Sequence, residues 1–312
     1  MLGKTAGGLY WMFRYLERSE NTARLVAAGQ RIALTRSRAD DDWTSLLETT
    51  ATCDAYLAAH REVTREAAID WMLREPKNPS SVLSVIEAAR ANARLVRTAL
   101  TREVWESVNE SWMAVRAALA SPVSERDLPA ALTLIRHRTA HVRGAFAGTM
   151  LRNDIYNFAR LGTFLERADA TARLLDVKYY VLLPSAQAVG SSLDNVQWET
   201  ILRAVSAEGA YRMTHGQDVR PRRIAQFLIL DGRQPRSLAF SVAKLCDNFR
   251  YLSDSYGARV PSQERTEALE AATFHRGIDD IFDAGLHEFI QDFLARLAAI
   301  GAQVEVDYRF YA

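Results

Sequence analysis

The sequence predicts an all-α fold in which a helical unit of about 150 residues occurs twice, the two pseudo-symmetric halves packing as one helical bundle. The first observation is a repeated segment, because LERSENTARL at residues 16–25 returns as LERADATARL at residues 165–174. Seven of the ten positions are identical at a shift of 149 residues, and shared charges at fixed spacing indicate a tandem duplication. The second observation is apolar residues at three-and-four spacing, which indicate helices with one buried side. The third is a low content of helix breakers, 8 prolines and 15 glycines in 312 residues.

The first half is predicted to be a series of helices separated by turn residues. The first helix is expected from Thr5 to about Arg36 and contains the first copy of the repeat. The second is expected from Trp43 to about His60 and continues over residues 62–73, after which Pro76 and Pro79 break the chain. Three more helices are expected, one opened by a Ser80 or Ser81 cap and ending near Leu100, one over residues 102–120 and one over residues 129–151.

The second half aligns with the first beyond the repeated segment. Trp43 matches Trp198 at a shift of 155, and Ser81 matches Ser237 at a shift of 156, so only small insertions separate the copies. The two halves are therefore expected at residues 1–152 and 153–312. The match fades after Gly257, although a long helix is still expected over residues 278–300. The alternating residues Val304, Val306 and Tyr308 indicate either a short strand or an extended arm at the end of the chain.

Composition narrows the classes of partner and site. A formal net charge of +1 attracts neither nucleic acid nor an anionic membrane, and no apolar run approaches the length of a membrane span. Cys53 and Cys246 are isolated thiols, which fit a reducing cytosol and argue against a structural zinc site. The chain contains no Walker loop, dinucleotide-binding glycine pattern, Gly-x-Ser-x-Gly or His-Glu-x-x-His motif. We therefore expect a cytoplasmic protein with no cofactor and no metal.

The segment LYWMFRYLERSENTARL at residues 9–25, the repeated LER(S/A)(E/D)xTARL and Asn92-Ala93-Arg94 resemble the bacterial alpha-E family, a domain of unknown function. The resemblance spans essentially the whole chain. It implies an all-helical cytoplasmic protein that is commonly encoded beside a circularly permuted ATP-grasp ligase and a transglutaminase-like peptidase. These neighbours imply a system that forms or modifies peptides. The family supplies no established reaction.

The repeat contains the first group of candidate ligand-binding residues. At 100° per residue, Glu17, Glu20 and Arg24 fall on one side of a helix, beside the side that is expected to be packed. The group consists of Glu17, Arg18, Glu20 and Arg24, together with Glu166, Arg167, Asp169 and Arg173. One interpretation is a network of ion pairs that fixes the register of the two halves. The other is a polar pocket between the halves, where arginines bind a carboxylate or a phosphate. A di-iron site is not predicted, because Glu20 and Asp169 occupy the positions where that pattern requires histidine.

A second group of candidate ligand-binding residues lies on the helix that begins at Ser80 or Ser81. It consists of Arg90, Asn92, Arg94 and Arg97, with Asn248 and Arg250 as the matching residues of the second half. Arg90 and Arg97 correspond to Cys246 and Ser253, so only the first half carries this charged side. Ordinary drift of a solvated surface accounts for the difference. Alternatively, the first half has its own anion site.

Three functions are consistent with the sequence. The leading hypothesis is an accessory or substrate-binding component that works with an ATP-grasp ligase and holds a peptide-like or anionic ligand in a charged groove between the halves. The second is an enzyme in its own right, with Glu17 and Glu166 as acid and base. The third is a structural helical protein that forms a homo-oligomer. No motif in the sequence decides whether the protein is an enzyme.

Overall fold

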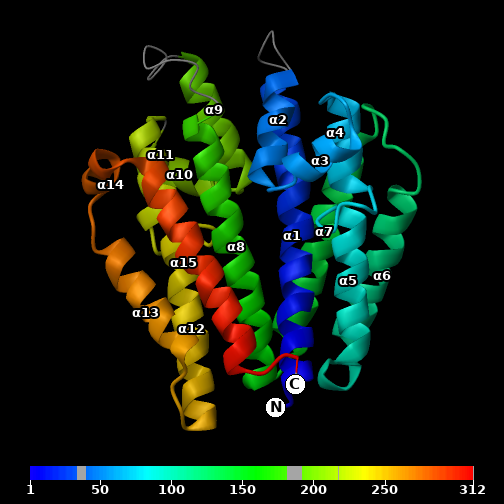
Figure 1. Cartoon of the computed structure of the whole chain (residues 1–312), viewed down its shortest axis with the longest axis vertical. Helices are drawn as coiled ribbons and strands as arrows, with labels where there is room; N and C mark the ends of the chain where they lie inside the picture. Colours follow the sequence, from blue (N-terminus) through cyan, green and yellow to red (C-terminus); the bar gives the residue numbers. More distant parts are fainter. Residues whose placement is uncertain (34–39, 181–191, 217, 312) are drawn as a thin grey trace.

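The computed structural model describes residues 1–33, 40–180, 192–216 and 218–311, which form an elongated helical bundle (Figure 1). In these ranges the chain forms fifteen α-helices and one 3-10 helix, and it forms no strand. The predicted all-α class is confirmed. The two ends of the chain lie at the same end of the bundle, where Gly3 approaches the backbone of Arg309 (Figure 1). None of the helices in the described ranges is both long enough and apolar enough to cross a membrane.

Two long helices, α1 (Gly3–Ala33) and α8 (Asp154–Tyr180), lie side by side at the centre of the bundle (Figure 1). Each carries one copy of the repeated segment. The helices approach closely where Gly162 of α8 meets Tyr10 of α1, because a Cβ at Gly162 would lie 2.1 Å from the Tyr10 carbonyl oxygen. The predicted first helix is confirmed as α1, and residues 34–36 of that prediction lie outside the described residues.

The remaining helices of the first half follow in chain order. They are α2 (Asp40–Thr49), α3 (Cys53–Ala59), α4 (Arg65–Leu73), α5 (Val82–Leu95), the 3-10 helix η1 (Arg97–Ala99), α6 (Arg102–Ala118) and α7 (Leu128–Thr149). Ser81 caps α5 by accepting a hydrogen bond from the Ser84 N–H at 3.3 Å, as the sequence predicts.

The prediction of one helix from Trp43 to His60 is wrong, because the chain turns between α2 and α3. Ala51 adopts a left-handed φ of 53°. The Thr52 N–H donates to the Leu47 carbonyl at 3.0 Å and the Ala51 N–H to the Glu48 carbonyl at 2.9 Å. This is a Schellman-type helix end, which usually has glycine at the left-handed position. Alanine at that position hides the break from sequence inspection.

The second half contains seven further helices after α8. They are α9 (Ser192–Ala204), α10 (Glu208–His215), α11 (Pro221–Leu230), α12 (Leu238–Tyr256), α13 (Pro261–Phe274), α14 (Ile278–Ala284) and α15 (Leu286–Asp307). The single helix expected over residues 278–300 is wrong, because Gly285, with φ 98°, separates α14 from α15.

The end of the chain is helical, so the prediction of a strand or an extended arm is also wrong. Helix α15 continues to Asp307. Val304 is fully buried in the core, whereas Val306 is 69% exposed. Residues two positions apart lie on nearly opposite sides of a helix, so this alternating segment is compatible with a helix. Packing of Val304 outweighs the modest preference of valine for strands.

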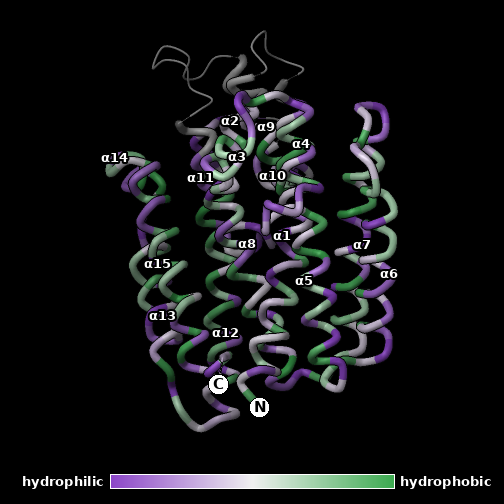
Figure 2. The backbone as a smooth tube through the Cα atoms, turned by 45° about the vertical axis from the view of Figure 1, so that its right-hand side comes forward, coloured by the Kyte–Doolittle hydropathy of each residue, from purple (hydrophilic) through white to green (hydrophobic). Residues whose placement is uncertain are grey.

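The helices pack in the same order in both parts of the chain. Helices α5 and α7 pack on α1, and α6 packs on both of them. Helices α12 and α15 pack on α8, and α13 packs on both of them. Figure 2 shows hydrophobic and hydrophilic residues interspersed along the helices, as expected for helices that pack one apolar side on a core. The tandem duplication and the boundary between residues 152 and 153 agree with this arrangement and stay predictions.

Replacement of Gly162 by alanine tests the close approach of the central helices. The added methyl group would overlap the Tyr10 backbone, so α1 and α8 must separate. We expect the free energy of unfolding of Gly162→Ala, measured by urea denaturation, to fall by about 1–3 kcal/mol. Gly144 of α7 has open space around its Cβ position, and Gly144→Ala should gain up to about 1 kcal/mol from helix propensity. Equal stability of the two variants would contradict the close packing of α1 on α8.

Candidate functional site

The repeated segments place a cluster of charged side chains at the interface of α1 and α8. Three glutamates are buried there, Glu17, Glu20 and Glu166, which are 1%, 0% and 4% exposed. Among the described residues, seven arginines form ion pairs with these glutamates and with Asp169. They are Arg14, Arg18, Arg24, Arg143, Arg167, Arg173 and Arg236.

Each central helix supplies a carboxylate to an arginine of the other helix. Arg167 of α8 binds Glu17 of α1 with two parallel hydrogen bonds, from Nε to Oε1 and from Nη2 to Oε2, both 2.9 Å. Arg18 of α1 binds Glu166 of α8 in the same way, from Nε to Oε1 at 2.6 Å and from Nη2 to Oε2 at 3.0 Å. The Glu-Arg pair occupies the same position in both copies of the repeat, so the pairing is reciprocal. Bidentate arginine–carboxylate pairs are among the strongest polar contacts in proteins.

Each helix also contains the predicted pair four residues apart. Arg24 donates to Glu20 Oε1 from Nε at 2.9 Å and from Nη2 at 2.7 Å. Arg173 donates to Asp169 Oδ2 at 2.8 Å and to Oδ1 at 3.2 Å. The two pairs differ in burial, because the Asp169 and Arg173 side chains are 26% and 36% exposed and Glu20 is fully buried. The second pair is therefore accessible to a ligand.

Two arginines from other elements complete the cluster around Glu17 and Glu20. Arg236, which precedes α12, donates to Glu17 Oε1 at 3.0 Å and to Glu20 Oε1 at 2.6 Å. Arg143 of α7 contacts Glu20 Oε2 and lies 3.5 Å from Glu17 Oε2. Sequence analysis missed both. The alignment of the two halves offered one signal for Arg236. At the shift of 156 it matches Ser80, so the second half has an extra charge at this position.

The Glu166 side of the cluster contains fewer arginines. Arg14 of α1, also missed from the sequence, donates from Nε to Glu166 Oε2 at 2.9 Å and from Nη1 to the Tyr10 hydroxyl at 3.3 Å. Gly301 is the sixteenth residue of α15, the place that Arg143 holds in α7. The helix that packs on α8 therefore supplies no guanidinium here, and space remains beside Glu166 and Asp169.

The electrostatic balance keeps the buried carboxylates ionised. Burial opposes ionisation of Glu17, but Arg167 and Arg236 outweigh it and lower its pKa below the ordinary value. Burial is likewise outweighed by Arg236 at Glu20, and by Arg14 and Arg18 at Glu166, so both of these pKa values are lowered. For Arg236 burial prevails over the attraction of Glu17, and its pKa falls to about 10. Glu17, Glu20 and Glu166 are therefore ionised at neutral pH.

A cavity of about 310 Å³ adjoins the cluster on the Glu166 side. Its charged lining consists of Arg18, Arg24, Arg173 and Arg236 with Glu166 and Asp169. Asn21 also lines the cavity, and its Nδ2 is buried without a hydrogen-bond partner in the described part of the chain. Arginine and amide donors outnumber the acceptors around this space, which suits a carboxylate or phosphate group.

Two matching turns border the cavity. Ser206, at the end of α9, has a φ of 54° and the same hydrogen-bond pattern as Ala51 at the end of α2. The Ser206 hydroxyl accepts a hydrogen bond from Arg24 Nη1 at 2.6 Å. Ala51 has no hydroxyl for Arg173. Within the described ranges, Arg173 hydrogen-bonds through Nε and Nη2 only, so both N–H groups of its Nη1 are available at the cavity.

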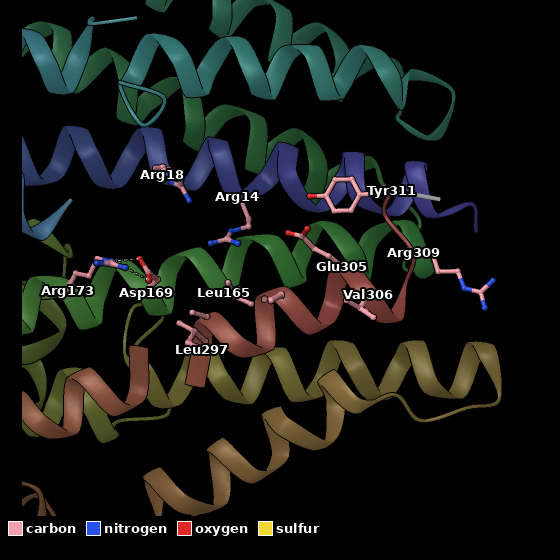
Figure 3. A pocket seen from close by; sticks show the side chains of 13 residues that line it. Arg14, Arg18, Leu165, Asp169, Arg173, Leu297, Glu305, Val306, Arg309 and Tyr311 are labelled. Carbon is pink, nitrogen blue, oxygen red and sulfur yellow. Dashed lines mark hydrogen bonds and ion pairs between the residues drawn. The ribbon is translucent and has the colours of Figure 1, made fainter. Parts of the chain in front are cut away.

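A larger groove of about 700 Å³ runs along α1, α8 and α15 (Figure 3). It shares Arg18, Asp169 and Arg173 with the cavity, so these side chains form the wall between the two spaces. Figure 3 shows Arg173 with Asp169 toward one end of the groove and Glu305 with Tyr311 toward the other. The groove thus has a basic end and an acidic end.

The second group of predicted residues lies outside both spaces. Arg90 stacks on Trp112 at 4.0 Å, and Arg97 lies over Trp105 at 5.2 Å. The side chains of Asn92 and Asn248 donate to backbone carbonyls of their own helices. Arg94 and Arg250 are exposed. None of these six residues lines the cavity or the groove, and their role in ligand binding stays a prediction.

Removal of Arg236 tests whether the cluster holds the fold together. Arg236→Ala leaves Glu17 and Glu20 buried with one partner fewer, and we expect the free energy of unfolding to fall by about 3–5 kcal/mol. Arg233 lies in the same loop, is 77% exposed and pairs with Asp231. Arg233→Ala is the matched control and should retain the wild-type melting temperature. Arg236→Ala with wild-type stability would refute a structural role for this arginine.

The lowered pKa values predict how stability depends on pH. Unfolded glutamate titrates near pH 4.3, whereas Glu17, Glu20 and Glu166 titrate lower in the folded protein. Their contribution to stability is therefore complete above about pH 4.3 and is lost as the pH falls toward the folded values. Urea denaturation at a series of pH values should show this loss, and Glu166→Gln should reduce it. An identical pH dependence in wild type and Glu166→Gln would contradict the prediction.

Comparison with known proteins identifies the family. A model of the Alpha-E family, a predicted alpha-helical domain with a conserved ER motif, matches residues 1–308. Uncharacterized protein Mb2597 of Mycobacterium bovis and uncharacterized protein Rv2567 of Mycobacterium tuberculosis are each 24% identical over 276 residues. These alignments cover 82% of this chain and 30% of each relative, so the chain spans less than a third of their length. No solved structure matches. The chain belongs to the Alpha-E family.

Proposed function

We propose that this protein is the substrate-binding component of a system that forms or modifies peptides, and that the cavity holds an anionic group of a peptide-like ligand. The carrying observation is the excess of positive charge around the cavity. Among the described residues, four arginines line the cavity with only two carboxylates, Glu166 and Asp169. A ligand carboxylate or phosphate would balance part of this excess.

The two sides of the cluster support two different roles. Around Glu17 and Glu20, Arg143, Arg167 and Arg236 fill the space and occupy the carboxylate oxygens. This side locks α1 to its neighbours. On the other side, Arg173 is paired only with Asp169 among the described residues and faces open space. A ligand therefore binds on the Asp169 side without dismantling the buried pairs.

The surroundings of Glu17 and Glu166 favour binding over acid–base catalysis by these residues. Both carboxylates accept hydrogen bonds on both oxygens, and both have lowered pKa values. A general acid or base at neutral pH needs a pKa near 7. Arginine partners move these groups in the opposite direction, so a role in holding the site together suits them better.

The proposed partner is a circularly permuted ATP-grasp ligase, with a transglutaminase-like protein in the same cytoplasmic system. The resemblance to the alpha-E family is the reason for naming this class of enzyme. The lengths of the mycobacterial relatives support a role beside another protein unit, because the region that matches this chain is only 30% of each relative. In those proteins the Alpha-E region is one part of a larger polypeptide, as expected for a unit that works beside another one.

Replacement of Arg173 tests the anion site with inorganic phosphate and acetate as probes. At constant ionic strength, either anion should raise the melting temperature of the wild-type protein, because it binds only the folded state. Arg173→Ala should lose this response, whereas its free energy of unfolding should change by only about 0–1 kcal/mol, because its ion pair is partly exposed.

The matched control is Arg102→Ala on α6, which breaks an exposed pair of the same spacing with Glu106. It should respond to both anions like wild type. A full response in Arg173→Ala would overturn the proposed site. With the partner ligase, the mass spectrum of the product should change when this protein is omitted or replaced by Arg173→Ala. An unchanged product would remove the accessory role.

A further inference from the structure

We infer that the groove binds a short peptide in extended, zwitterionic form, with its C-terminal carboxylate at Arg18 and Arg173 and its N-terminal ammonium group at Glu305. The inference rests on the proposed anion site and adds the class, length and direction of the ligand. Three features carry it: opposite charges at the two ends of the groove, a wall of small residues, and the distance between the ends.

The acidic end is built by Glu305 of α15. Figure 3 shows its carboxylate directed toward α1, close to Tyr311, whereas the side chain of Arg309, which also lines the groove, extends away from Glu305. A hydrogen bond with Glu305 raises the pKa of Tyr311, which places the phenol against this carboxylate. No described arginine or lysine lies within ion-pair distance of Glu305. An ammonium group in the groove would supply the missing positive charge.

The basic end is built by Arg18 and Arg173. Both line the groove and the cavity, so a carboxylate at this wall reaches donors from both spaces. Arg173 Nη1 has no acceptor in the described part of the chain, and the Asp169 carboxylate that binds Nε and Nη2 is 26% exposed. A ligand carboxylate can therefore pair with Arg173 beside Asp169.

The wall of the groove on α15 is made of small residues. Ala298, Gly301 and Ala302 follow three-and-four spacing and line one side of the helix. A Cβ at Gly301 would lie 3.4 Å from the Tyr10 hydroxyl and 3.5 Å from Leu165 Cδ2, so a larger side chain here would press against α1 and α8. The wall admits a peptide backbone with small side chains.

The distance between the charged ends sets the length of the ligand. Leu297 lies near the basic end in Figure 3, and Glu305 is eight residues further along α15. At 1.5 Å per residue, these positions are about 12 Å apart along the helix. An extended chain rises about 3.3 Å per residue, so a peptide of three or four residues spans the two ends.

The charges at the two ends of the groove favour a peptide with free termini over a fatty acid or phosphate. A fatty acid has the carboxylate but leaves Glu305 without a cation. Phosphate is too small to reach both ends. A peptide with free termini presents one negative and one positive group at the required separation.

The experiment is calorimetric titration of the full chain with tetra-alanine, dialanine, N-acetyl-tetra-alanine and tetra-alanine amide. Tetra-alanine should bind tightest, and blocking either terminus should weaken binding about fivefold. Glu305→Gln should abolish the preference for a free N-terminus and retain the preference for a free C-terminus. Arg173→Ala should do the reverse.

Ala302→Leu narrows the groove at an exposed position and should abolish peptide binding while the response to phosphate persists. Ala299→Leu, at an exposed alanine of α15 outside the groove, is the matched control and should bind peptide normally. Binding that ignores the termini, or octanoate binding as tightly as tetra-alanine, would overturn the inference. If the same samples still respond to phosphate, the peptide inference fails and the proposed anion site stands. If they do not respond to phosphate, the inference and the proposed anion site are both refuted.

Discussion

The reciprocal pairing of Glu17 with Arg167 and of Glu166 with Arg18 is the constraint on which the rest of the structure depends. A buried carboxylate is unfavourable unless it is paired and hydrogen-bonded. Here each partner lies on the opposite central helix, so satisfying both charges fixes the rotation and the register of α1 against α8. Apolar packing alone would tolerate neighbouring registers, whereas bidentate pairs tolerate only small displacements. The close approach at Gly162 is compatible with this register and excludes a larger residue.

The departure from symmetry leaves the open space in which we propose the binding site. Around Glu17 and Glu20, Arg143 and Arg236 close the space with additional pairs. On the other side, Gly301 occupies the place of Arg143 and Ser80 that of Arg236, so the same architecture leaves a cavity and a groove. The other side retains arginines with incomplete partners, as anion-binding sites do.

In the proposed function, the difference between the two sides of the cluster accounts for selective binding by an all-helical protein that has no recognisable catalytic motif. Three of the four arginines that line the cavity, Arg18, Arg24 and Arg236, are held in place by buried carboxylates before a ligand arrives. Such preorganisation reduces the entropy lost on binding. The lowered pKa values of Glu17 and Glu166 keep these carboxylates charged, so the positions of their arginine partners do not change with pH in the neutral range.

The sequence by itself determined the helical class, the pairing of the two repeated segments and the eight charged residues at their interface. Identical charges in two copies indicated either a network of ion pairs or a ligand pocket at this interface. Only the tertiary structure decided which arginines complete the pairs, because Arg14, Arg143 and Arg236 lie outside the repeat and reach it through packing. The break at Ala51 could not be foreseen from the sequence, because alanine occupies a left-handed position that usually holds glycine. The open space beside Asp169 could not be foreseen either, since it arises from the absence of a side chain on a distant helix, and an absence leaves no pattern in the sequence.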